Sequence, residues 1–208
     1  MSRVPPPTGS AVARCPWVGT ADAEYARYHD EEWGVPHSES DRLFEKICLE
    51  GFQAGLSWLT ILKKRESFRA AFHGFDAARI ARYTTKDVDR LMADPGIVRN
   101  RAKILATIGN ANAVIALSGR MPLAHFLWQF LPDGPLLNRR TAAADVPTET
   151  DLSKRVSKAL KAEGFRFVGP TTVYAFLQSS GFVNDHLISC HRHAACERQM
   201  RGFKVPKA

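Results

Sequence analysis

The sequence has few cysteines, no long apolar run and little strand-like alternation, and each shortage excludes a class of protein. Four cysteines in 208 residues, at positions 15, 48, 190 and 196, are too few and too unevenly spaced for a secreted disulfide framework. No stretch approaches the roughly 18 continuous apolar residues that cross a bilayer. The start, MSRVPPPTGSAVAR, lacks the apolar core of a signal peptide. We therefore expect a cytosolic protein that does not enter a membrane.

The scarcity of strand-like alternation leaves helices as the main element. Apolar residues recur at steps of three and four in segments 41–56, 57–72, 85–93, 97–117, 123–131, 151–164 and 171–181. Thr148 or Thr150, ahead of Asp151, is expected to cap the helix that follows. The fold class predicted is all-α, a helical bundle.

The chain divides into three expected parts. Residues 1–13, with Pro5, Pro6 and Pro7, are predicted to form a disordered leader. Residues 14–195 are predicted to form a single domain of one or two closely packed lobes, and residues 196–208 a basic tail. Within the domain, the irregular stretch 132–150 is expected to be a solvated loop.

A short helix, a tight turn and a second helix are predicted within TKDVDRLMADPGIVRNRAKIL. The first helix reaches Met92, residues 94–96 turn, and the second helix starts at about Ile97. Free amides at a helix start can seat a phosphate, and the net charge of +8 favours a polyanionic partner. The residues expected to contact phosphate are Gly96, Ile97, Val98, Arg99, Arg101 and Lys103. The pattern resembles the helix-hairpin-helix module of DNA repair enzymes, and an ordinary helix turn is the alternative.

Cysteine and histidine occur in pairs near the two ends of the chain. Cys15 is followed after thirteen residues by His29, whereas His186 and Cys190 lie four residues apart. Two thiolates and two imidazoles suit a closed tetrahedral zinc site, which would be structural because it leaves no open position. The alternative ligands are His191, His193 and Cys196. The spacing therefore indicates a metal that ties the two ends together, but it leaves the ligand set open.

One carboxylate falls on the apolar side of a predicted helix. Glu50 follows Leu43 and Ile47 at steps of four and three, so the three share a stripe. A buried, unpaired carboxylate costs on the order of several kcal/mol, so it is either satisfied locally or used. The aromatic residues nearby in sequence are Trp17, Tyr25, Tyr28, Trp33 and Trp58. A pocket of this kind suits a planar, electron-poor ring; the alternative is an aromatic core with Glu50 bonded to a helix end.

Four longer segments match a known family in the same order. They are CPWVGTADAEYARYHDEEWGVP, LFEKICLEGFQAGLSWLTILKKRESFRAAFHGFD, DPGIVRNRAKI and GFRFVGPTTVYAFLQSSGFVNDHLISC. Together they closely resemble the bacterial 3-methyladenine DNA glycosylase I family of helix-hairpin-helix glycosylases, over about residues 14–190. Two features depart from that family: Phe52 stands where some relatives have a polar residue, and the chain after Cys190 is unlike theirs.

The resemblance implies a role for each candidate residue. It implies one structural zinc per chain, on Cys15, His29, His186 and Cys190. It implies that Glu50 is the catalytic, base-binding carboxylate and that the pocket aromatics are Tyr25, Tyr28 and Trp58, with Trp33 and Trp17 nearby. Tyr28 and Trp58 are expected to sandwich the base. Gly55 and Leu56 are expected to probe the gap that the extruded nucleotide leaves in the DNA.

The resemblance also implies the activity. The expected enzyme flips 3-methyladenine out of alkylated double-stranded DNA and excises it by hydrolysis, which releases the free base. Lyase activity is not expected, because Asn100 stands close to the hairpin, where lyase members of the superfamily carry a lysine. No acidic residue lies between the hairpin and Asp133, where the superfamily usually carries a catalytic aspartate. We expect a monomer in the bacterial cytosol. The alternatives are a noncatalytic zinc-containing DNA-binding module and a glycosylase for another damaged base.

Overall fold

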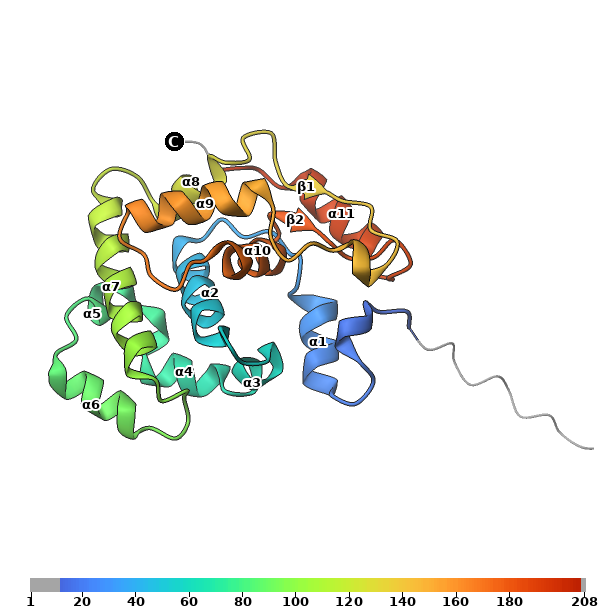
Figure 1. Ribbon diagram of the computed structural model, residues 1–208. Helices are drawn as coiled ribbons and strands as arrows, with labels where there is room; N and C mark the ends of the chain where they lie inside the picture. The colour runs from blue at the N-terminus through green and yellow to red at the C-terminus, as the bar shows by residue number, and fades with distance from the viewer. Residues whose placement is uncertain (1–11, 207–208) are drawn as a thin grey trace, which may run out of the picture.

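A buried central helix organises the computed structural model, which describes residues 12–206. This helix, α2 (Ser40–Gln53), forms because apolar residues return every three or four positions and pack on several neighbours. Figure 1 shows it inside a larger lobe of helices. The other helices of this lobe are α3 (Trp58–Lys63), α4 (Arg65–Ala71), α5 (Ala77–Ile80), α6 (Thr85–Ala93), α7 (Arg101–Ser118), α8 (Leu123–Trp128), α9 (Asp151–Ala162) and α10 (Pro170–Ser179), with the 3-10 turn η2 (His73–Phe75).

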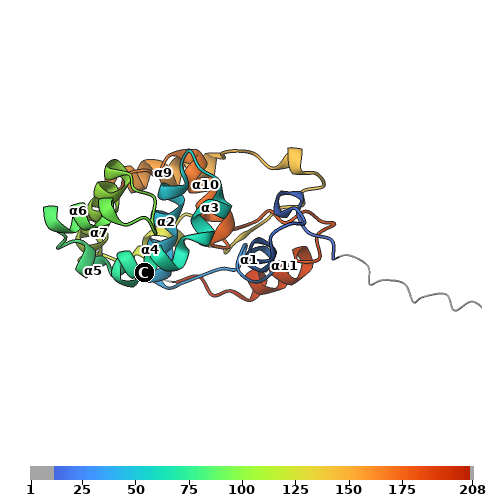
Figure 2. The same cartoon turned by 90° about the horizontal axis from the view of Figure 1, so that it is seen from below.

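A smaller lobe is built from both ends of the described chain. Its elements are η1 (Pro16–Val18), α1 (Ala23–Glu31), β1 (Leu136–Leu137), η3 (Ala143–Asp145), β2 (Val183–Asn184) and α11 (His193–Gly202). In both views α1 and α11 lie on the same side of the larger lobe (Figures 1 and 2). A second hydrophobic cluster, with Cys15, Trp33 and Leu187 among its members, accompanies the main core.

The two strands correct the expectation of a solvated loop over residues 132–150. β1 pairs with β2 in parallel, with Leu136 opposite Val183, and a further bridge joins Arg140 to Leu187. Each strand has only two residues, which is too short for an alternating pattern to appear in the sequence. The pairing fixes this stretch across the smaller lobe.

Two predicted helices have different bounds in the structure. Segment 57–72 forms two helices, α3 and α4, which meet at Lys64. The helix expected from about Ile97 begins at Arg101, because the Ile97 side chain is buried in the core and the chain must enter there before it turns helical. The Asn100 side chain then caps α7 by accepting a hydrogen bond from the Lys103 amide at 3.1 Å.

The two predicted ends of the domain have different outcomes in the structure. The proposed leader lies outside the described residues except for residues 12 and 13. The domain boundary expected at 195/196 falls inside α11. The helix continues past it because the side chains of Cys196 and Met200 are buried against the rest of the protein. Thr150 is confirmed as the cap of α9: its hydroxyl accepts from the Ser153 amide at 3.2 Å. Among the described residues, no helix has the length and apolar character needed to cross a membrane.

Candidate active site

A cavity of about 360 Å³ brings together Glu50 and all five aromatic residues predicted to surround it. Those aromatic residues are Trp17, Tyr25, Tyr28, Trp33 and Trp58. Glu50 comes from α2 of the larger lobe, whereas Tyr25 and Tyr28 come from α1 of the smaller lobe. Val146, next to η3, closes part of the wall, as does Ser179 at the end of α10. Side chains of both lobes therefore line the cavity, and its shape depends on the packing of one lobe against the other.

Glu50 is a buried carboxyl group with one polar neighbour in direct contact. Its side chain is only 3% exposed, and Oε1 accepts a hydrogen bond from Ser179 Oγ at 3.1 Å. Burial raises the pKa of Glu50, and the charge of Lys46 and the bond from Ser179 oppose that shift. The alternative, a filled aromatic core with Glu50 bonded to a helix end, fits only in part: Ser179 is the last residue of α10, but Ser179 and Glu50 both line a cavity.

The aromatic side chains pair with one another around the cavity. The Trp17 and Tyr25 ring centroids are 5.0 Å apart, and those of Trp17 and Trp33 are 5.1 Å apart. Tyr28 and Trp58 are 5.4 Å apart with their planes tilted by 43°. Rings paired at that separation leave no room for a third ring between them. The predicted sandwich of a base between Tyr28 and Trp58 would therefore require the two rings to move apart.

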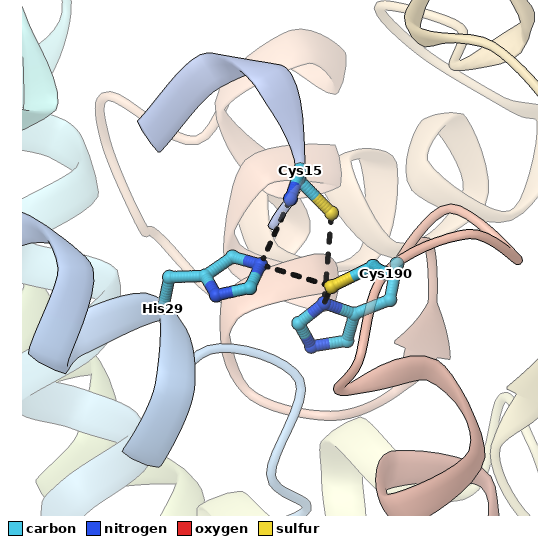
Figure 3. A group of neighbouring side chains, drawn as sticks. Cys15, His29 and Cys190 are labelled. Atoms are coloured by element: carbon cyan, nitrogen blue, oxygen red, sulfur yellow. Dashed lines mark hydrogen bonds between the residues drawn. The ribbon is translucent and has the colours of Figure 1, made fainter. Parts of the chain in front are cut away.

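Four buried side chains next to the cavity could hold a metal ion. Ligand atoms of Cys15, His29, His186 and Cys190 all lie within 4.8 Å of one another, and Figure 3 shows three of these residues labelled. Cys190 Sγ is 3.5 Å from His29 Nε2, and 3.6 Å from His186 Nδ1. Tetrahedral zinc with Zn–S of about 2.3 Å and Zn–N of about 2.1 Å would hold sulfur and nitrogen about 3.6 Å apart. The arrangement therefore fits a four-coordinate ion.

Hydrogen bonds orient both imidazoles toward the cluster. His29 uses its other nitrogen, Nδ1, for Asp30 Oδ1 at 2.7 Å, and His186 uses Nε2 for the Trp33 carbonyl oxygen at 3.2 Å. Asp30 in turn accepts from Arg14 at 2.6 Å. The alternative ligands are engaged elsewhere: His191 contacts Asp30, His193 contacts the Asn138 carbonyl, and Cys196 contacts the Gly34 carbonyl. Among the described residues, one possible metal group therefore combines two cysteines with two histidines, whereas His191 belongs to a second, more exposed group with His29 and Asp30.

The hairpin between α6 and α7 presents fewer free amides than the sequence predicted. The Gly96 amide donates to Asp94 Oδ1 at 2.7 Å, and the Ile97 amide donates to the Asp94 carbonyl at 3.5 Å. Both groups are therefore used inside the turn, and the predicted phosphate seat reduces to the amide of Val98. Arg99 and Arg101 are exposed, and Arg101 pairs with Asp89 at 3.4 Å.

The prediction that Lys103 contacts phosphate is not supported by its position. Its side chain is buried, and its ammonium donates to the Phe52 carbonyl at 2.9 Å and the Ala54 carbonyl at 2.6 Å. These carbonyls end α2, just before the exposed turn that carries Gly55 and Leu56. Gly55 has φ +80°, a conformation that favours glycine. Lys103 therefore supports this turn from inside the protein.

The comparisons with known proteins agree with this geometry. A family model described as methyladenine glycosylase matches residues 17–193. The chain is 50% identical over 178 residues to DNA-3-methyladenine glycosylase 1 of Escherichia coli, covering 85% of this chain and 95% of that protein. The chain belongs to the methyladenine glycosylase family.

Solved members of the methyladenine glycosylase family share the fold. A crystal structure of 3-methyladenine DNA glycosylase I superposes with a TM-score of 0.85 at 49% identity, covering 87% of this chain and all (100%) of that one. A tyrosine-to-phenylalanine variant of such an enzyme, in complex with 3-methyladenine, gives a TM-score of 0.82 at 38% identity, covering 86% and 96%. The resemblance predicted from the sequence motifs is thereby confirmed.

Three residues near the candidate site were not predicted from the sequence. Lys46 lies behind the aromatic wall and donates to the Tyr28 hydroxyl at 2.8 Å. Lys64 donates to the Pro95 carbonyl in the hairpin at 2.9 Å. Ser179 bonds to Glu50, as described above. For Lys46, the sequence did offer one indication of its place near the site: it precedes Glu50 by four residues, a spacing that puts both side chains on one helix face.

The departure at Phe52 has a structural explanation. Its side chain is buried, with its ring centroid 4.6 Å from that of Phe68 and 5.8 Å from that of Phe72. It belongs to the core of the larger lobe, so an apolar residue is suited to this position.

Proposed function

We propose that this chain flips 3-methyladenine out of alkylated double-stranded DNA and hydrolyses its N-glycosidic bond without lyase activity. The observation that carries the proposal is a buried carboxyl group, Glu50, in a cavity walled by aromatic rings. The relative in complex with 3-methyladenine supports this base as the ligand. The name of the Escherichia coli relative supports glycosylase action on DNA.

The cavity suits the charge and shape of the damaged base. Methylation at N3 gives adenine a positive charge, which the Glu50 carboxylate complements while it accepts hydrogen bonds from the base edge. Flipping the nucleotide costs a few kcal/mol. Stacking on aromatic side chains is worth about 1 to 3 kcal/mol per base and offsets much of that cost.

The reaction then needs little help from a general acid. A water oxygen forms a bond to the sugar C1′, the bond from C1′ to the base breaks, and its electron pair stays on the base. The base leaves neutral, and the attacking water gives its proton to the surrounding solvent. A pocket that orients the cationic base and keeps its charge complemented lowers the barrier by holding the reacting groups in place.

The hairpin and the α2–α3 turn would contact the DNA. Leu56 has an exposed side chain, and with Gly55 it would fill the gap left by the extruded nucleotide. Arg99 and Arg101 would neutralise backbone phosphates next to the Val98 amide. Lys103 would act by holding the turn rather than by touching phosphate.

We further propose that the ion bound by the cluster is zinc, one per chain. Two thiols and two imidazoles suit zinc, and the closed ligand set gives the ion a structural role that joins α1 to the segment before α11. Elemental analysis of the purified protein should find about one zinc per chain. A fully folded, metal-free preparation would contradict this proposal.

One assay separates the proposed function from its alternatives. The protein is incubated with methylated double-stranded DNA, and the released bases are identified by chromatography. Release of 3-methyladenine with the strand left intact is expected. Release of a different base would indicate another lesion, and no release with retained DNA binding would indicate a noncatalytic module.

A variant pair tests the role of Glu50 in the same assay. Glu50→Gln is expected to weaken 3-methyladenine binding and excision far more than DNA binding, because it removes the charge that faces the base. Glu66→Gln makes the same change on a side chain that is 80% exposed and should behave like the wild type. Excision by Glu50→Gln at the wild-type rate would remove Glu50 from the site.

The expected oligomeric state is a monomer, and size-exclusion chromatography of the purified protein would test it.

A further inference from the structure

Lys46 touches the aromatic wall of the cavity from behind. Its ammonium lies 4.1 Å from the Trp58 ring centroid and 4.7 Å from the Tyr28 ring centroid, and it donates to the Tyr28 hydroxyl at 2.8 Å. Lys46 does not line the base cavity; it lines a small neighbouring cavity. Ser179 lines both cavities. The positive charge therefore sits next to the base site without occupying it.

Lys46 also lies on the same face of α2 as Glu50. Lys46 and Glu50 are one helical turn apart, a spacing that brings side chains into proximity. Burial raises the pKa of Glu50, and the charge of Lys46 is the first cause that opposes it. Burial likewise lowers the pKa of Lys46, and the charge of Glu50 is the first cause that opposes that shift. Each group thus favours the charged form of the other.

The surroundings of the pair offer Glu50 little other positive charge. From α1, Tyr25 and Tyr28 face Glu50, and burial raises the pKa of each so that both stay protonated. Asp185, after β2, lines the same cavity and adds no positive charge. The two cations of α4 are paired with other carboxylates: Arg65 donates to Glu32 at 3.0 Å and Arg69 donates to Glu45 at 2.8 Å. Glu32 and Glu45 also favour the ammonium form of Lys46.

We propose that Lys46 is a positioning residue that keeps Glu50 ionised in the empty pocket and fixes the Tyr28 hydroxyl at the pocket wall. This inference rests on the proposed function, because an ionised Glu50 matters only if the pocket receives a cationic base. Since Lys46 donates to the Tyr28 oxygen, the hydroxyl proton of Tyr28 is directed elsewhere. Without the ammonium, a buried Glu50 would take up a proton at a higher pH and could no longer complement the charge of the base.

Substitution of Lys46 tests the inference by two separate readouts. The first is the pKa of Glu50, measured by carbon-13 NMR of labelled glutamate carboxyl groups and assigned by the signal that is missing in Glu50→Gln. In Lys46→Met and Lys46→Gln this pKa should rise by about 1 unit or more, the usual effect of removing a nearby opposite charge. In Lys46→Arg it should stay near the wild-type value. Lys46→Gln retains a hydrogen-bond donor and so separates charge from hydrogen bonding.

The second readout is the pH profile of 3-methyladenine excision from methylated DNA. The acidic limb should move up by the same amount in Lys46→Met and Lys46→Gln, which corresponds to about tenfold slower excision below that limb. Lys158→Met makes the same change at an exposed position of α9 and should leave the profile unmoved. A purely structural role would lower excision equally at every pH.

The outcomes are distinguishable. An unchanged Glu50 pKa in both Lys46→Met and Lys46→Gln overturns the inference, whatever the activity. If the wild type releases no 3-methyladenine, the proposed function fails, while the NMR titration still decides whether Lys46 controls the ionisation of Glu50.

Discussion

Replacing Lys103 by methionine should destabilise the protein and disturb the turn that faces the DNA. Methionine keeps a similar length but cannot donate, so the Phe52 and Ala54 carbonyls lose their partner. The last carbonyls of a helix have no intrahelical donors, and a cation at that end also complements the helix dipole. A hydrogen bond to a charged group contributes about 1.5 to 3 kcal/mol, and water can replace part of it at the half-buried Ala54 carbonyl. We expect a loss of about 2 to 4 kcal/mol in the free energy of unfolding.

Urea denaturation followed by tryptophan fluorescence would measure this loss. With a slope of about 2 kcal/mol per M, the midpoint should fall by about 1 to 2 M. Lys64→Met is a matched control, because Lys64 also donates to two carbonyls, Pro95 and Gly96, but from a more exposed position. Its cost should be about 1 kcal/mol or less. A Lys103→Met midpoint equal to that of Lys64→Met would refute the reasoning from burial.

The functional effect of Lys103→Met should be selective. Glu50 lies one turn before the end of α2, so binding of free 3-methyladenine should be retained. Excision from duplex DNA should fall about 10- to 100-fold, because a shift of the probing turn by about 1 Å is enough to misplace the flipped nucleotide. Equal losses in free-base binding and excision would show that Lys103 supports the pocket as a whole.

Three further predictions concern the metal, the fold and the DNA contact. Asp30→Asn should weaken zinc binding about 10- to 100-fold in a chelator competition, because it removes the carboxylate that orients His29. Gly181→Ala should lower the urea midpoint far more than Gly74→Ala: both glycines have positive φ, but a Cβ at position 181 would lie 2.2 Å from the Pro36 nitrogen, whereas nothing is within 4 Å at position 74. Replacing Arg99 and Arg101 together by alanine should reduce the salt dependence of DNA binding by about 0.9 decade for each phosphate that the variant no longer neutralises.

Local signals in the sequence predicted most of the helices and the composition of the cavity. Helix periodicity and the Thr150 cap act within a few residues, so they can be read without knowing the fold. Glu50 stood out because a carboxylate on an apolar stripe is costly, and the structure places it at a cavity wall. Spacing paired the candidate metal ligands, but only the fold brings Cys15 and His29 to Cys190 and places His191 in a different group with Asp30.

The errors arose where a long-range contact decides the role of a residue. Lys103 follows two arginines and looks like a further phosphate contact, yet its ammonium reaches residues 52 and 54, about fifty positions away. Lys46 looks like a solvated residue of an amphipathic helix until α1 packs against it. The β1–β2 pair joins segments more than forty residues apart through two residues each. No local pattern carries such information.

The position of the metal cluster suggests how a structural ion would affect a reaction that it does not take part in. Trp33 of the cavity wall packs on the cluster, with its ring centroid 4.6 Å from that of His186 and 6.2 Å from that of His29. Cys15 immediately precedes the segment that carries Trp17. The hairpin and Glu50, by contrast, belong to the larger lobe, whose main core touches the smaller cluster through Trp58 and Val146. Removal of the metal should therefore loosen the aromatic wall first, so that the chelated protein loses affinity for 3-methyladenine before it loses affinity for DNA.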